Sequence, residues 1–132
     1  MEKDMKSAML AVAERFTQAF SNRDAAGFVS TYGPDATVWH NDDRIVQGRE
    51  ENLAKLQGFF SICSAVEYRN IERDVTDAST LVQQHVVWGR LNDGREFEVP
   101  VCMVIKFKDG LIHHIAEYCD PAPFHQLLHG TD

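Results

Sequence analysis

The sequence predicts an α+β fold, a cone-shaped α+β barrel in which three N-terminal helices pack on a strongly curved antiparallel sheet. Helical periodicity is confined to about the first 60 residues, and strand-like runs separated by short turns fill the rest of the chain. Strands joined by such short loops pair as antiparallel hairpins, because parallel pairing needs a long crossover. Strands of about ten residues twist, so we expect the sheet to curl and leave a conical space beneath the helices.

The first helix is predicted over residues 5–22, where apolar residues recur at steps of three and four. Asp24 is a suitable N-cap for a short second helix that carries Phe28 and Tyr32. The sequence Gly33-Pro34-Asp35 should end this helix, because proline cannot continue the hydrogen-bond ladder.

The strands follow from turn residues between apolar runs. A brief strand is expected over 36–40, a turn at 41–43 and a third helix over 49–60. Four longer strands are predicted at 66–75, 80–91, 97–107 and 111–119, and a short helical turn at 124–128 closes one end of the cone. The Asp-Gly at 109–110 is a strong hairpin signal between the last two strands.

Composition indicates one domain, residues 1–132, with 44% apolar residues and a net charge of −7. The 13 basic residues are scattered, so nucleic acid is not an expected partner. No window approaches the ~18 apolar residues that cross a bilayer, and the N-terminus does not read as a signal peptide. Three cysteines without paired spacing fit reduced thiols, which predicts a cytoplasmic protein.

Three segments carry a family resemblance: AFSNRDAAGFVSTYGPDATVW, VQGREENLAKL and KFKDGLIHHIAEYCDP. Together with the order of the elements, they resemble the nuclear transport factor 2-like superfamily, which includes SnoaL-like polyketide cyclases, ketosteroid isomerase and limonene-epoxide hydrolase. The resemblance implies a conical pocket, a small apolar or aromatic ligand and chemistry without a cofactor. Relatives often form homodimers through the open sheet face, and apolar residues on both alternations of the strand at 97–107 favour such a dimer here.

Transferred residue by residue, the resemblance preserves few catalytic groups. The general base of ketosteroid isomerase falls on His40, but its two oxyanion donors fall on Phe16 and Met103, neither of which donates a proton. The Arg-x-Asp pair of limonene-epoxide hydrolase falls on Gln84 and Val86.

The last strand supplies a candidate acid, because the last-strand carboxylate of limonene-epoxide hydrolase corresponds to Glu117. A histidine titrates near neutrality, so His40 suits acid/base work with Glu117 or Asp120 as its partner. Alternation puts these two acids on opposite faces of the strand, and the sequence leaves open which one faces the pocket.

Further pocket residues are predicted from their positions. Gln84, Val86 and Trp88 alternate along one strand and so share one of its faces, and the resemblance assigns this face to the pocket. Trp88 would then be an aromatic wall of the pocket. The residues expected to contact a ligand are Phe16, Tyr32, Trp39, Asn41, Trp88 and Met103. No metal site is expected, because His113 and His114 point to opposite faces and no third ligand accompanies His125 and His129.

These observations favour a cofactor-independent SnoaL-like isomerase, cyclase, dehydratase or hydrolase with His40 and Glu117 or Asp120 as its acid/base groups. Two alternatives remain open at this stage. One is a ligand-binding or sensory module with the same pocket and no turnover. The other is a structural dimerisation domain.

Overall fold

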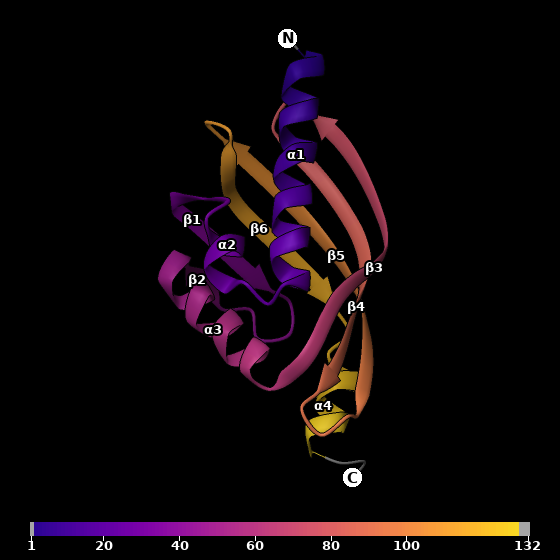
Figure 1. Cartoon of the computed structure of the whole chain (residues 1–132). Helices are drawn as coiled ribbons and strands as arrows, with labels where there is room; N and C mark the ends of the chain where they lie inside the picture. The colour runs from indigo at the N-terminus through magenta and orange to yellow at the C-terminus, as the bar shows by residue number, and fades with distance from the viewer. Residues whose placement is uncertain (1, 130–132) are drawn as a thin grey trace.

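The structure is a computed structural model that describes residues 2–129, with side chains for residues 3–128. Its helices and strands confirm the predicted α+β class, and Figure 1 shows the long first helix lying across the concave face of a strongly curved sheet. The elements in chain order are α1 (Glu2–Ser21), α2 (Ala25–Val29), β1 (Tyr32–His40), β2 (Val46–Gly48), α3 (Arg49–Ser61), β3 (Cys63–Asp77), β4 (Thr80–Leu91), β5 (Glu96–Lys108), β6 (Leu111–Cys119) and α4 (Ala122–His129).

The six strands form one sheet in the order β2-β1-β6-β5-β4-β3. Consecutive strands from β3 to β6 pair antiparallel, as their short connections predict, whereas β1 lies parallel to β6. Asp109 and Gly110 both have positive φ, 54° and 79°, which fits the tight turn predicted between β5 and β6. The β1–β6 pairing joins the early half of the chain to the last strand.

The main errors in the predicted boundaries lie between residues 29 and 48. The second helix ends at Val29, so Tyr32 begins β1 instead of belonging to the helix. Pro34 lies within β1 and not before it, because the register between β1 and β6 shifts between Tyr32 and Thr37 and no ladder pair uses residue 34. The three-residue strand β2 was not predicted; at that length it has no detectable alternation.

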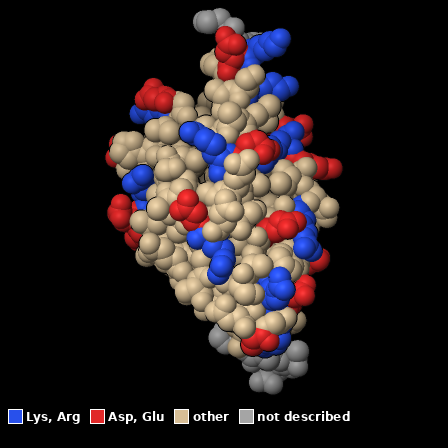
Figure 2. Space-filling view, viewed as in Figure 1, with Lys and Arg blue, Asp and Glu red and all other residues tan. Residues whose placement is uncertain are grey.

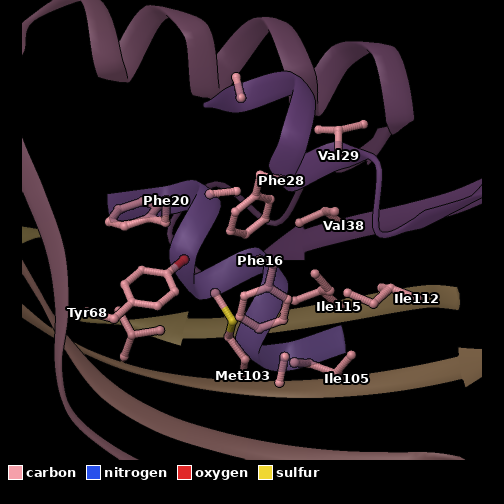
Figure 3. Packing of buried hydrophobic residues seen from close by; sticks show 14 of the residues in the cluster. Phe16, Phe20, Phe28, Val29, Val38, Tyr68, Met103, Ile105, Ile112 and Ile115 are labelled. Atoms are coloured by element: carbon pink, nitrogen blue, oxygen red, sulfur yellow. The ribbon is translucent and has the colours of Figure 1, made fainter. Parts of the chain in front are cut away.

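The core lies between α1 and the concave face of the sheet. Phe16, in the C-terminal half of α1, is fully buried, and Figure 3 shows its ring directed toward Met103 and Ile115 on the sheet. Residues 3–8 at the start of α1 are exposed, and from Met9 onward the helix buries one stripe against the sheet, as an amphipathic helix does. The buried residues of α1 are Met9, Val12, Ala13, Phe16, Ala19 and Phe20.

A polar contact fixes α1 to the edge of the sheet. The Arg73 guanidinium on β3 binds Glu14 and donates from Nη2 to Thr17 Oγ1 at 3.0 Å. Its Nε donates to Gln83 Oε1 on β4 at 2.7 Å. Arg73 therefore connects the helix, the edge strand and the buried Gln83 in one network.

Gly89 on β4 lies directly under the ring of Phe97 on β5, and a Cβ at Gly89 would stand 2.3 Å from the Phe97 ring. Gly89→Ala should therefore destabilise the protein by about 1–3 kcal/mol, since an added methyl group displaces a packed side chain. Gly58→Ala is a matched control: a Cβ at Gly58 in α3 meets nothing within 4 Å, so alanine should stabilise the helix by about 0.5–1 kcal/mol. Urea unfolding of both variants tests the pair; equal effects would contradict the predicted packing.

The face drawn in Figure 2 carries acidic and basic side chains intermixed, with no large area of one sign. Among the described residues, none of the helices has the length and apolar composition required to cross a membrane.

Candidate functional site

A cavity of about 240 Å³ lies between the helices and the concave face of the sheet. Most of its wall is aromatic and aliphatic, which suits a flat apolar molecule. The lining residues are Phe20, Phe28, Tyr32, Val38, His40, Asp42, Asn52, Lys55, Leu56, Phe59, Tyr68, Val87, Phe97, Val99, Val101, Met103, Ile115, Glu117, Cys119, Pro121 and Phe124.

The parallel pairing of β1 with β6 brings His40 and Glu117 together in this cavity. The two residues are partners in the ladder, and His40 Nε2 lies 3.0 Å from Glu117 Oε2. Both side chains are largely buried, with 12% of His40 and 18% of Glu117 exposed. A proton on Nε2 makes this contact a charge-assisted hydrogen bond from the imidazole to the carboxylate.

Asn41 holds the ends of these two strands together. Its Nδ2 donates to the Cys119 carbonyl at 3.1 Å, and its Oδ1 accepts from the Cys119 N–H at 2.8 Å. The Asn41 N–H also donates to the Glu117 carbonyl at 3.0 Å. These three bonds fix the register that places His40 opposite Glu117.

Glu117 is the central charge of the cavity. Burial, and after it the negative charge of Glu117, raises the pKa of both Tyr32 and Tyr68. The same two causes raise the pKa of the Cys119 thiol to about 11. His85 behaves differently, because burial lowers its pKa to about 4 while Glu117 acts in the opposite direction. The negative charge of Glu117 thus raises the pKa of groups on four strands, β1, β3, β4 and β6.

The two cavity tyrosines differ in their hydrogen bonds. The Tyr32 hydroxyl donates to Asn52 Oδ1 at 2.7 Å, and Asn52 Nδ2 in turn donates to Gln47 Oε1 at 2.9 Å. The Tyr32 hydroxyl proton is therefore already used and is not available to a ligand in this arrangement, although the Tyr32 oxygen can still accept a hydrogen bond. Tyr68 makes no such bond within the described part of the chain.

The structure separates the two candidate acids. Glu117 lines the cavity, whereas Asp120 lies beyond the end of β6, is exposed and accepts a hydrogen bond from the Ala122 N–H at the start of α4. Asp120 therefore does not face His40 across the cavity.

Of the six predicted ligand contacts, Tyr32 and Met103 line the cavity. Phe16 lies in the core instead, because α1 packs it directly on the sheet, and Asn41 is engaged by backbone groups. Trp39 lies on the outer face of the sheet, with its ring 5.3 Å from that of Tyr118.

The predicted parity of β4 is wrong. Gln83, His85 and Val87 face inward, so Trp88 lies on the outer face, where Arg69 covers its ring at 4.2 Å and its Nε1 donates to Glu96 Oε1 at 2.9 Å. The resemblance assigned the register one residue out of phase, which reverses the face of every side chain.

Several lining residues were not predicted. Tyr68 has the alternation of β3 as its only signal, while Asn52 and Phe59 lie on α3. Phe124 lies on α4, where the sequence predicts a helical turn that closes one end of the cone; it lines the cavity and packs on Phe97, with ring centroids 4.7 Å apart.

The outer face of the sheet carries partly exposed apolar side chains, among them Trp39, Val104 and Tyr118. A homodimer through this face stays a prediction. Within residues 3–128 no three His, Cys, Asp or Glu side chains gather at metal-binding distance.

Solved structures of other proteins share the cone-shaped fold. The chain has the fold of a candidate polyketide cyclase from Xanthomonas campestris pv. campestris, at a TM-score of 0.80 and 16% identity over 91% of this chain and 96% of that one. It also resembles the pinacolase BvnE from Penicillium brevicompactum, at a TM-score of 0.83 and 10% identity over 96% and 95% of the two chains. A protein with a ketosteroid isomerase-like fold from Catenulispora acidiphila DSM 44928, solved with trimethylamine, has a TM-score of 0.71 and 13% identity, with 81% and 83% of the chains covered.

The family follows from the sequence comparison. Residues 13–115 match the SnoaL-like domain, so the chain belongs to the SnoaL-like family within the nuclear transport factor 2-like superfamily. No curated protein matches the sequence.

Proposed function

We propose that this protein is a cofactor-independent enzyme that moves a proton on a small apolar or aromatic molecule, as an isomerase, cyclase, dehydratase or hydrolase does. The observation that supports it is the contact of 3.0 Å between His40 and Glu117 at the wall of an otherwise apolar cavity. An acid/base pair needs no cofactor to transfer protons between carbon and oxygen atoms.

The geometry suggests how the two residues divide the work. His40 Nε2 contacts Glu117 Oε2, and His40 Nδ1 is fully enclosed, so neither nitrogen is free to meet a ligand. Glu117 Oε1 has no hydrogen-bond partner among the described residues. Glu117 therefore takes the proton from the ligand at Oε1, while His40 orients the carboxylate through its Nε2 contact with Oε2.

The cavity walls suggest the ligand class. Phe28, Val99 and Val101 present apolar surface to the same cavity as Glu117, while Asp42 and Lys55 are exposed lining residues. A bicyclic ketone of naphthalene size fits this description, since its rings contact the walls and its α-carbon protons are acidic enough for a carboxylate base.

The test uses 2-tetralone in D2O, with NMR detection of deuterium incorporation at its α-carbons. We expect the protein to accelerate the exchange above the buffer rate, with saturation as the ketone concentration rises. The proton leaves carbon for Glu117 Oε1, the carboxylic acid exchanges with D2O, and a deuteron returns to the same carbon.

Binding of 2-tetralone without faster exchange would overturn the enzymatic proposal and favour the ligand-binding or sensory alternative. Failure to bind it, together with a filled cavity in a crystal structure, would favour the structural role.

A further inference from the structure

Tyr68 lies on β3, on the far side of β5 and β4 from Glu117, and lines the same cavity. It is 6% exposed, and Figure 3 shows its hydroxyl directed inward, between Phe20 and Met103. Both of these neighbours also line the cavity. The phenol is thus presented to the interior from the wall opposite the acid/base pair.

The ring of Tyr68 is held from both sides. The Phe20 ring stacks on one side at a centroid distance of 4.1 Å, and the His85 imidazole stacks on the other at 3.9 Å. Stacked rings in a packed interior leave little rotamer freedom. The hydroxyl therefore has a fixed position before any ligand arrives.

A buried chain of hydrogen bonds holds His85 in turn. Arg73 Nε donates to Gln83 Oε1, which leaves the Gln83 amide N–H to donate to His85 Nδ1 at 3.0 Å. His85 is then the neutral Nε2–H tautomer. The imidazole that supports Tyr68 is fixed by a network that begins at the surface with Glu14.

The Tyr68 hydroxyl is a donor of this wall that a ligand can use, whereas the unpartnered His85 Nε2 is fully enclosed. The Tyr68 hydroxyl has no hydrogen-bond partner among the described residues and is not one of the fully enclosed polar atoms, whereas the Tyr32 hydroxyl is used by Asn52. Burial holds the pKa of Tyr68 far above neutrality, so the phenol keeps its proton. A neutral donor left without a partner in an apolar site selects a ligand that carries an acceptor.

We propose that Tyr68 donates a hydrogen bond to an oxygen atom of the ligand, opposite Glu117, and so selects small apolar molecules that carry a carbonyl or ether oxygen. This inference rests on the proposed function for the existence of the ligand, and assigns the specificity of the site to a residue outside the acid/base pair. Phe20 and His85 are positioning residues, since they act through the Tyr68 ring.

The experiment is a binding cycle with 2-tetralone and tetralin, which share one ring skeleton and differ in the carbonyl group. Dissociation constants are measured by protein NMR titration for the wild type, for Tyr68→Phe and for Tyr118→Phe. The control Tyr118 is an exposed tyrosine of the outer face. We expect Tyr68→Phe to lower the preference for 2-tetralone over tetralin about 2- to 10-fold, the net effect of one hydrogen bond, and Tyr118→Phe to leave it unchanged.

The infrared carbonyl stretch of 2-tetralone bound to the wild type is a second measurement that needs no variant. A shift to lower wavenumber relative to the ketone in hexane is expected, and this shift should disappear in Tyr68→Phe. An unchanged preference for 2-tetralone together with an unshifted carbonyl stretch would overturn the Tyr68 role. The enzymatic proposal for Glu117 would not be affected, because the deuterium-exchange experiment tests it separately. Failure of both molecules to bind would overturn the ligand site and the Tyr68 proposal together.

Discussion

Glu117→Gln is expected to lower the protein-catalysed exchange of 2-tetralone by about 10²- to 10⁴-fold, the usual contribution of a positioned general base. Glutamine keeps the size of the side chain and accepts the hydrogen bond from His40 Nε2, so the affinity for 2-tetralone should change little. Only the ability to take a proton is lost. Exchange rates and dissociation constants measured on the same samples separate the two effects.

His40→Asn belongs to the same experiment, because it removes the hydrogen bond that aims the carboxylate. A hydrogen bond to a charged group contributes about 1.5–3 kcal/mol, so exchange should slow by about 10- to 150-fold while affinity is retained. Glu98→Gln is the matched control, since Glu98 is an exposed carboxylate on the outer face of β5. Wild-type exchange in Glu117→Gln would show that another group is the base.

His85 should make the fold sensitive to mild acid. Burial holds its pKa at about 4 in the folded protein against 6.5 for an unperturbed histidine, with Arg73 lowering it further and Glu117 opposing the shift. Between pH 6.5 and pH 4 the unfolded chain binds a proton that the folded chain does not, so stability falls as pH falls through this range. The full loss is about 3 kcal/mol and levels off below pH 4.

The measurement is the free energy of unfolding in urea at a series of pH values for three proteins. His85→Gln keeps an acceptor for the Gln83 amide but cannot titrate, so its stability should fall less steeply than that of the wild type between pH 6.5 and pH 4. His113→Gln, at an exposed position of β6, should follow the wild-type curve. Parallel curves for the wild type and His85→Gln would show that His85 binds its proton equally well in the folded and in the unfolded protein, and would contradict the lowered pKa.

Local signals predicted the long elements well. Amphipathic periodicity found α1, and strand runs with short turns found β4, β5 and β6 to within about a residue, because these elements bury one face and their loops admit one pairing. The signals failed between Val29 and Gly48. There the position of β1 depends on its pairing with β6, and that of β2 on its pairing with β1, rather than on their own residues.

The candidate site likewise combines residues that the sequence identified with placements that depended on strand pairing. His40 and Glu117 were identified from the chain, but the choice between Glu117 and Asp120 needed the register of β6. Trp88 was placed on the wrong face because a register error of one residue reverses a strand. Tyr68 carries no local signal that separates it from an ordinary core aromatic.

By itself, then, the sequence determined the fold class, the curved antiparallel sheet and the presence of a histidine and an acid suited to proton transfer. These follow from local periodicity, turn chemistry and residue type. Only the tertiary structure decided that β1 lies parallel to β6, that His40 meets Glu117 at 3.0 Å, and that Tyr68 faces them from β3. The reason is that each of these contacts joins residues distant in sequence, and their geometry is set by sheet register and curvature, which no single segment encodes.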